Sequence, residues 1–221
     1  TPLGIAADPA GRYIYVAGFY QPMLYKIDIA AGAIAGSIEI GASPSGVAVT
    51  ADGALIVTAD RDDNQISLID AKTFTRKGIV KVGAHPFGVT IDPQGERAYT
   101  ANVESNDVSV VDLAAGTLIG TVATGKRPYA VALAKGRGFA SDQYGGTVSV
   151  FDLVSLQPLK RIPVGEYPEG IESSADGSSI YVVNWFSNDV WTINAETLAV
   201  TAKMPAGDGP RAFGTFLREA L

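Results

Sequence analysis

The sequence predicts an all-β fold, a β-propeller of four-stranded antiparallel blades with about 42 residues per repeat. Three observations lead there: a proline at regular spacing, four short apolar segments in each period, and almost no helical periodicity. The prolines are separated by 42, 42, 42, 40 and 42 residues, at Pro2, Pro44, Pro86, Pro128, Pro168 and Pro210. Periods of this length are typical of solenoids and propellers, and the content of each period distinguishes the two.

The third period shows how four strands are predicted within one repeat. An apolar run from Gly88 to Thr90 is followed by the turn Asp92–Gly95, where Asp and Gly favour a tight reversal. Second and third strands follow at Arg97–Thr100 and Val108–Asp112, and a fourth at Thr117–Val122. The third strands alternate with period two, as strands with two distinct faces do. Five near-identical periods disfavour a β-sandwich with coincidental spacing.

The repeats divide the chain into one predicted domain, residues 1–221. The five full repeats are 2–43, 44–85, 86–127, 128–167 and 168–209, and a closing strand is expected at 210–221. That last segment repeats only the first strand of a blade, and proteins avoid an unpaired edge. We therefore expect six or seven blades in an intact protein with a further N-terminal segment. The alternative is a five-bladed ring with the tail packed elsewhere.

Small residues stand at one position of each first strand. They are Gly4, Gly46, Gly88, Ala130 and Gly170. First strands would converge on the propeller axis, where space is smallest, and glycine in a strand often marks a close backbone approach. The composition of the first strand therefore agrees with the predicted fold.

Several segments of the third repeat resemble the YVTN repeat of β-propeller proteins. These are Pro86–Gly95, Ala98–Asn102 and Ser105–Asp112, and the resemblance extends over essentially the whole chain. The fourth repeat departs most, because it is two residues shorter and has Lys135–Gly138 in place of the Asp-Gly turn. The resemblance implies an exported bacterial or archaeal protein, so a periplasmic or extracellular location is expected. It is specific for fold and weak for function.

Composition excludes several classes of protein. The 221-residue chain has no cysteine, which excludes disulfides and thiolate metal sites. Its net charge is −6 with scattered Lys and Arg, which argues against nucleic acid as a partner. No apolar run reaches the ~18 residues of a membrane-spanning helix. The chain begins at Thr1-Pro2 without a leader pattern, so we expect that any export signal has been removed or was never there.

One predicted loop face is rich in aromatic residues. It is formed by the connections from fourth to first strands and from second to third strands, because strands in a blade run up and down in turn. Its expected binding residues are Phe19, Tyr20, Phe87, Tyr129, Tyr144, Tyr167, Trp185 and Phe186. Exposed aromatics mixed with Arg are common interface anchors, and the adjacent pair Trp185-Phe186 is the strongest candidate. The alternative is that these rings pack locally. The opposite face has few distinctive side chains apart from Phe74.

A second group of polar residues is expected at the channel mouth. It consists of His85, Arg127, Glu169 and Arg211. His85 is the only histidine of the chain and lacks the partners of a zinc site. The equivalent positions in other repeats carry different residues, so His85 is interpreted as a surface-loop histidine.

Two acidic patterns are interpreted as turn chemistry. Asp28, Asp70, Asp112, Asp152 and Asn194 recur at the end of third strands. Asx side chains that bond their own turn explain them. The segment Asp60–Asn64 resembles a calcium loop but lacks its glycine and glutamate. Asp60 also recurs in other repeats as an Asp or Asn. No metal site, catalytic residue or cofactor is predicted.

The leading hypothesis is a non-catalytic binding scaffold that holds a protein or an extended ligand on the aromatic face. Similar propellers serve as lactonases and quinoprotein dehydrogenases, so the resemblance implies an enzyme with a site at the channel mouth as one alternative. The other alternative is an accessory subunit of a larger redox complex. The sequence does not indicate an oligomeric state.

Overall fold

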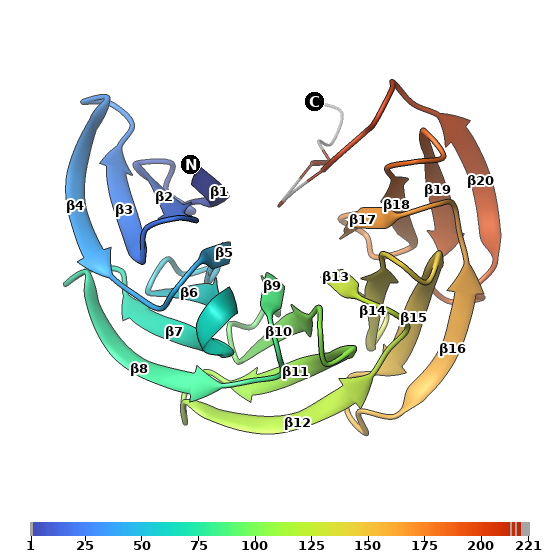
Figure 1. The fold of residues 1–221 in the computed structure, drawn as a ribbon, viewed down its shortest axis with the longest axis horizontal. Coiled ribbons are helices and arrows are strands. Elements are labelled where there is room, and N and C mark those ends of the chain that lie inside the picture. The colour runs from blue at the N-terminus through green and yellow to red at the C-terminus, as the bar shows by residue number, and fades with distance from the viewer. Residues whose placement is uncertain (1, 213, 215, 218–221) are drawn as a thin grey trace. The chain divides into compact units, whose positions relative to one another are not determined.

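The computed structural model describes residues 2–212, 214, 216 and 217, and its described strands form five four-stranded antiparallel sheets (Figure 1). The first sheet contains β1 (Pro2–Ala7), β2 (Tyr13–Gly18), β3 (Met23–Asp28) and β4 (Ala33–Glu39); the second contains β5 (Pro44–Val49), β6 (Leu55–Asp60), β7 (Gln65–Asp70) and β8 (Thr75–Lys81); the third contains β9 (Pro86–Ile91), β10 (Arg97–Asn102), β11 (Asp107–Asp112) and β12 (Thr117–Ala123); the fourth contains β13 (Pro128–Ala134), β14 (Arg137–Asp142), β15 (Thr147–Asp152) and β16 (Pro158–Pro163); the fifth contains β17 (Pro168–Ser173), β18 (Ser179–Asn184), β19 (Asp189–Asn194) and β20 (Val200–Pro205). Strands that follow one another in sequence pair with one another in every sheet. The predicted fold class is confirmed, and each sheet is one blade falling within one predicted repeat.

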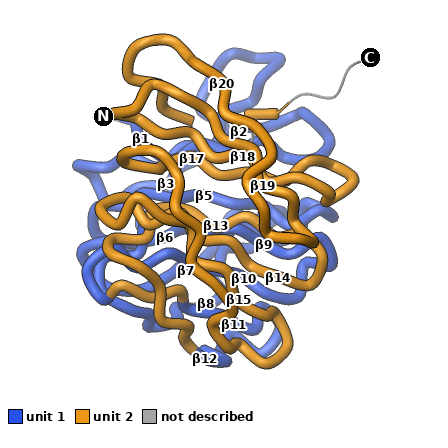
Figure 2. The backbone as a smooth tube through the Cα atoms, turned by 90° about the vertical axis from the view of Figure 1, so that its right-hand side faces the viewer, with its two compact units in different colours: residues 1–105, 109–120 blue, residues 106–108, 121–221 orange. Residues whose placement is uncertain are grey.

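The chain consists of two compact units, coloured separately in Figure 2. The first unit comprises residues 1–105 and 109–120, and the second comprises residues 106–108 and 121–221. The first two blades and most of the third belong to the first unit, and the last two blades belong to the second. The assignment of residues 1–221 to a single domain stays a prediction.

First strands of neighbouring blades pack against each other inside each unit, β1 with β5 and β5 with β9 in the first, β13 with β17 in the second. A Cβ added to Gly46 would meet the backbone N of Val89 at 3.0 Å. A Cβ added to Gly170 would lie 2.7 Å from the Cβ of Ala212. This close approach explains the small residues that recur in the first strands.

The middle strands of the second, third and fourth blades are buried on both faces. In β6, residues Ile56 to Asp60 are all buried, and in β11 the same holds from Val108 to Val111. The core of the first unit includes Val57 and Leu68 of the second blade together with Val111 of the third. Successive residues of β7 have different buried surroundings, as the predicted period-two alternation requires. The Ser67 hydroxyl donates to the Asp60 carboxylate, whereas Leu68 packs in the hydrophobic core.

The Asx turns predicted after the third strands are confirmed in all five blades. Each side-chain Oδ1 accepts a hydrogen bond from a backbone N–H three residues later. The bonds are Ala31 to Asp28 at 3.0 Å, Thr73 to Asp70 at 2.8 Å, Ala115 to Asp112 at 2.8 Å, Ser155 to Asp152 at 2.7 Å and Thr197 to Asn194 at 2.8 Å. These five residues are accounted for by turn geometry.

The described part of the chain contains one short helix, the 3₁₀ turn η1 (Arg61–Asp63). No helix among the described residues is long and apolar enough to cross a membrane. Asp60, before η1, is buried and turns inward, where its carboxylate accepts bonds from the Thr58 and Ser67 hydroxyls at 2.7 and 2.6 Å.

The segment expected as a closing strand, 210–221, lies partly outside the described residues, at 213, 215 and 218–221. The described part, 210–212, 214, 216 and 217, belongs to no strand. The backbone N–H groups of Phe216 and Leu217 donate to a side chain instead, the Glu172 carboxylate of β17, at 2.7 and 2.8 Å.

Candidate functional site: an aromatic loop surface

The two loop sets predicted to share a face do lie together in the third, fourth and fifth blades. The N–H groups of Glu104, Tyr144 and Phe186 in the second-to-third loops each donate at 3.1 Å to a carbonyl of the loop that enters the same blade. The accepting carbonyls belong to Ala84, Lys126 and Glu166. These bonds connect each pair of loops into one surface, as the strand directions require.

A residue with left-handed φ precedes five of the six repeat prolines, namely Pro44, Pro86, Pro128, Pro168 and Pro210. The residues and their φ angles are Ser43 (49°), His85 (55°), Arg127 (55°), Tyr167 (54°) and Gly209 (60°). Four of them carry side chains in a region that favours glycine, so the backbone there is held by its surroundings. His85 therefore occupies a position that the repeat shapes without requiring histidine, in agreement with its interpretation as a loop residue.

Asparagine side chains hold several of these left-handed residues. The Oδ1 atoms of Asn64, Asn106 and Asn188 accept the N–H of His85, Arg127 and Gly209 at 2.9, 2.8 and 2.8 Å. Each asparagine lies in the second-to-third loop of the preceding blade. The loops are therefore fixed at the blade junctions before any ligand arrives, which lowers the entropic cost of binding.

Four aromatic rings of the second unit form one cluster on this face. Tyr167 lies at its centre, with ring centroids 5.1 Å from Tyr144, 4.2 Å from Phe186 and 6.2 Å from Trp185. Trp185 and Phe186 are 4.5 Å apart. Local packing therefore accounts for part of each ring, yet Tyr144 and Phe186 remain 48% and 51% exposed.

Two arginines lie over rings of this cluster. The guanidinium of Arg127 is 4.8 Å from the centroid of Tyr144, and that of Arg211 is 4.0 Å from Trp185. Both distances allow cation–π attraction. We call Tyr144, Tyr167, Trp185 and Phe186, with Arg127 and Arg211, the aromatic loop surface.

Glu169, one of the residues expected at the channel mouth, is buried and paired with Arg211 in the structure. The residue is 1% exposed, and its carboxylate accepts two bonds of 2.8 Å from Arg211 and one of 2.6 Å from the amide of Gln143. A buried carboxylate needs such partners because desolvation disfavours its charge. The sequence did not indicate Gln143, since its role depends on the contact between the fourth and fifth blades.

Tyr129 lies beside this ion pair. A β-bulge interrupts its strand between Pro128 and Val131, and another interrupts β17 between Pro168 and Ile171, so the residues after the prolines leave the regular pleat. Burial raises the pKa of the Tyr129 hydroxyl, and the negative charge of Glu169 raises it further. Tyr129 is therefore a neutral phenol at physiological pH.

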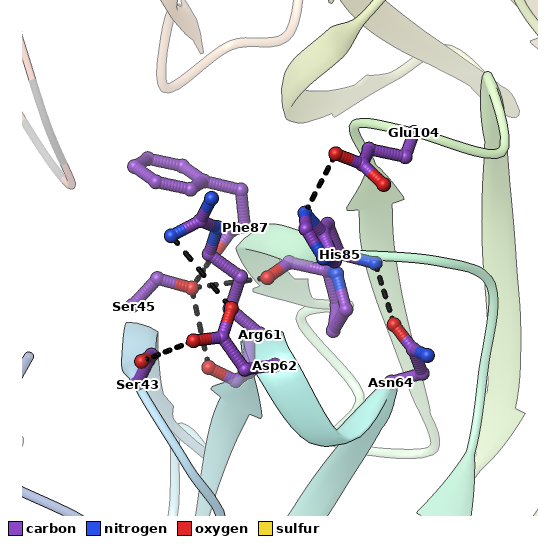
Figure 3. A network of polar contacts seen from close by, with 10 residues as sticks. Ser43, Ser45, Arg61, Asp62, Asn64, His85, Phe87 and Glu104 are labelled. Carbon is purple, nitrogen blue, oxygen red and sulfur yellow. Dashed lines mark hydrogen bonds and ion pairs between the residues drawn. The ribbon is translucent and has the colours of Figure 1, made fainter.

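The remaining expected residues belong to the first unit. Phe19 and Tyr20 contact each other at 5.1 Å, and Tyr20 is 77% exposed. Phe87 is half-buried, and Figure 3 shows it in the same region as His85, whose Nδ1 lies 3.1 Å from Glu104 Oε1. The structure therefore brings half of the expected aromatic binding residues into one cluster within the second unit.

The fold and the site define a protein of the β-propeller class with an arginine-flanked aromatic surface on its loops. No family model matches the sequence, and no curated protein matches it. Solved structures are similar in fold. Hydrazine synthase of Kuenenia stuttgartiensis is 16% identical with a TM-score of 0.71, over 95% of this chain and 88% of that one. A functionally unknown protein from Desulfotomaculum acetoxidans is 16% identical with a TM-score of 0.79, over 90% of this chain and 68% of that one.

Proposed function

We propose that the protein is a non-catalytic binding scaffold that holds a protein or an extended ligand on the aromatic loop surface. The observation that carries the proposal is the aromatic cluster. Tyr144 and Phe186 are half-exposed and both pack against Tyr167. Arg127 lies over Tyr144, and Arg211 lies over Trp185. Aromatic and arginine side chains are enriched among the residues that dominate interface energetics. Asparagine bonds to the N–H groups of Arg127 and Gly209 hold the backbone at two positions beside this surface.

The acidic group beside the aromatic loop surface favours binding over catalysis. The Glu169 carboxylate already accepts three hydrogen bonds, from Arg211 and Gln143. An enzyme of the lactonase or quinoprotein type would need several acids and histidines that converge on one ligand. The Glu169 carboxylate is instead directed to the protein's own guanidinium and amide groups.

The proposal extends to family and location. The proline-to-aspartate pattern of Pro86–Asp112 supports membership in the YVTN-repeat group, and that resemblance supports a periplasmic or extracellular location. The net charge of −6 supports a partner other than nucleic acid.

A pull-down from an extract of the source organism tests the proposal. The wild type is compared with Tyr144→Ala/Phe186→Ala, which removes the two exposed rings and leaves the loop bonds of their backbone in place. Leu159→Ala is the control, because Leu159 is 50% exposed on β16 of the same unit, in a strand instead of a loop. We expect a stoichiometric partner with the wild type and the control and its loss with the double variant. A partner retained by the double variant would contradict the proposal.

A further inference from the structure

A cavity of about 670 Å³ lies between the second and third blades, inside the first unit. It is bounded by the turns between first and second strands and between third and fourth strands, away from the loops described above. Its floor includes Leu55, Leu68 and Leu113, and its rim includes Asp52 and Lys77. The volume falls within the ~300–1,000 Å³ typical of small-molecule sites.

The repeat shows why this space is open. The same turn position, between third and fourth strands, is occupied in successive blades by Gly32, Phe74, Gly116, Leu156 and Leu198, with φ between 53° and 64°. The backbone is therefore alike at all five positions. What differs is the side chain that each turn supplies.

Phe74 fills the groove between the first and second blades. A Cβ added to Gly36 would lie 3.2 Å from its ring, and its ring is stacked 6.2 Å from Tyr15. Leu198 performs the same task between the fourth and fifth blades, where it packs against their shared core. Two grooves are thus closed by an apolar side chain from this turn.

Between the second and third blades the turn supplies Gly116, which has no side chain. A Cβ added to Gly78, the counterpart of Gly36, would meet nothing within 4 Å. A Cβ added to Gly116 itself would reach Leu68 Cδ1 at 3.7 Å. The cavity therefore includes the space that a phenylalanine ring occupies one blade earlier, over an apolar floor.

The rim of the cavity carries more negative than positive charge. Hydrogen bonds from Thr50 and the N–H of Ala54 lower the pKa of Asp52, so its carboxylate is ionised at neutral pH. Bonds from Thr73, and the nearby charge of Lys77, lower the pKa of Asp70. Lys77 thus offsets one of the two carboxylates, and no ion pair to Asp52 forms among the residues that the structure describes.

We propose that this cavity binds a small aromatic amine, with its ring on Gly78 and Leu68 and its ammonium group toward Asp52. The ring takes the place that Phe74 takes in the neighbouring groove, and the leucine floor removes it from water. The rim favours a cation over an anion of the same shape. This site is separate from the aromatic loop surface and does not depend on the function proposed for it.

Titration with phenethylamine, followed through the methyl NMR signals of Leu55, Leu68 and Leu113, tests the proposal. We expect saturable shifts of these signals. With 3-phenylpropionate, which has the same ring and an opposite charge, we expect binding at least about tenfold weaker. Absence of saturable shifts, or equal affinity for the acid, would overturn the proposal.

Gly116→Phe provides the structural control, because Phe74 at φ 53° shows that the equivalent turn accepts a phenylalanine at an angle close to the 64° of Gly116. The ring should fill the cavity and abolish the phenethylamine shifts. Gly32→Phe places the same residue at the equivalent turn of the first blade, where an added Cβ meets nothing within 4 Å, and should bind as the wild type does. Gly116→Leu, which copies the side chain of Leu198, replaces Gly116→Phe if that variant does not fold. Undiminished binding by the folded Gly116 variant would show that the ligand lies elsewhere.

Discussion

At the residue scale, the bond between Glu169 and Arg211 connects the segment after the fifth blade to β17. Arg211→Ala leaves a buried carboxylate with Gln143 as its remaining side-chain donor, and we expect a loss of about 1–3 kcal/mol in the free energy of unfolding. Arg211→Lys keeps the charge but cannot form the two paired hydrogen bonds, so its free energy of unfolding should lie between those of the wild type and Arg211→Ala. Urea denaturation measures both. Arg61 lies over Phe19, and the unfolding free energy of Arg61→Ala should stay within about 0.5 kcal/mol of the wild type. A loss as large as that of Arg211→Ala would contradict a stabilising role specific to the Arg211–Glu169 pair.

Asp60 gives a prediction on pH. Burial raises its pKa, so the folded state keeps this proton at pH values where the unfolded chain has lost it. The contribution of Asp60 to stability therefore falls as pH rises from the unfolded value through the raised folded value. Asp60→Asn should lessen that fall. The fold accepts the change, because Asn102 and Asn184 occupy the same place in the third and fifth blades.

Urea denaturation between pH 3 and pH 7 measures the effect of Asp60→Asn as a change of slope. Asp70→Asn provides the opposite sign, because turn hydrogen bonds lower the pKa of Asp70. Its stabilising contribution is present above the unfolded pKa and is lost as pH falls through the folded pKa. Identical slopes for the two variants would refute the assignment.

Much of the residue chemistry could be predicted from the sequence because it is local. An aspartate at a strand end bonds its own turn whatever the rest of the fold does, and Asp28 and Asp70 behave so. Glu169 could not be predicted in the same way. Its partners, Gln143 and Arg211, are 26 and 42 residues away, and the sequence does not show that they converge.

At the element scale, the loops depend on the asparagine bonds at blade junctions. Asn188→Gly keeps the left-handed backbone and removes the side-chain acceptor for the N–H of Gly209, so we expect a loss of about 1 kcal/mol in unfolding free energy. Asn188→Ala also removes the acceptor but keeps a Cβ at φ 55°, a conformation that alanine tolerates less well than asparagine or glycine, so it should be roughly 1 kcal/mol less stable than Asn188→Gly. Thermal and urea denaturation measure both. Equal stabilities for Asn188→Gly and the wild type would show that the bond does not fix the loop.

The strands themselves could be predicted from the sequence, since proline spacing, turn residues and period-two alternation agree in all repeats but the fourth, which is shorter and lacks the Asp-Gly turn. The cavity at Gly116 could not be predicted from the sequence. Its recognition requires knowing that Phe74, one repeat earlier, folds across a blade junction onto Gly36. A repeat predicts which positions are equivalent, whereas packing determines what a missing side chain leaves open.

At the scale of the whole molecule, the five blades share one plan and differ in the side chains placed on it. Rings and arginines gather on the loops of the fourth and fifth blades, and a cavity opens between the second and third. Function on such a fold is carried by the particular side chains rather than by the sheets. We accordingly propose that binding takes place on the aromatic loop surface.

Site-specific photo-crosslinking in cells of the source organism tests that claim most directly. A benzophenone amino acid replaces Phe186 in one variant and Leu159 in another, since the two positions are 51% and 50% exposed in the same unit. If the aromatic loop surface binds a partner, we expect one discrete crosslinked species from position 186 and none from position 159. No crosslink at 186, or the same species from both positions, would contradict it.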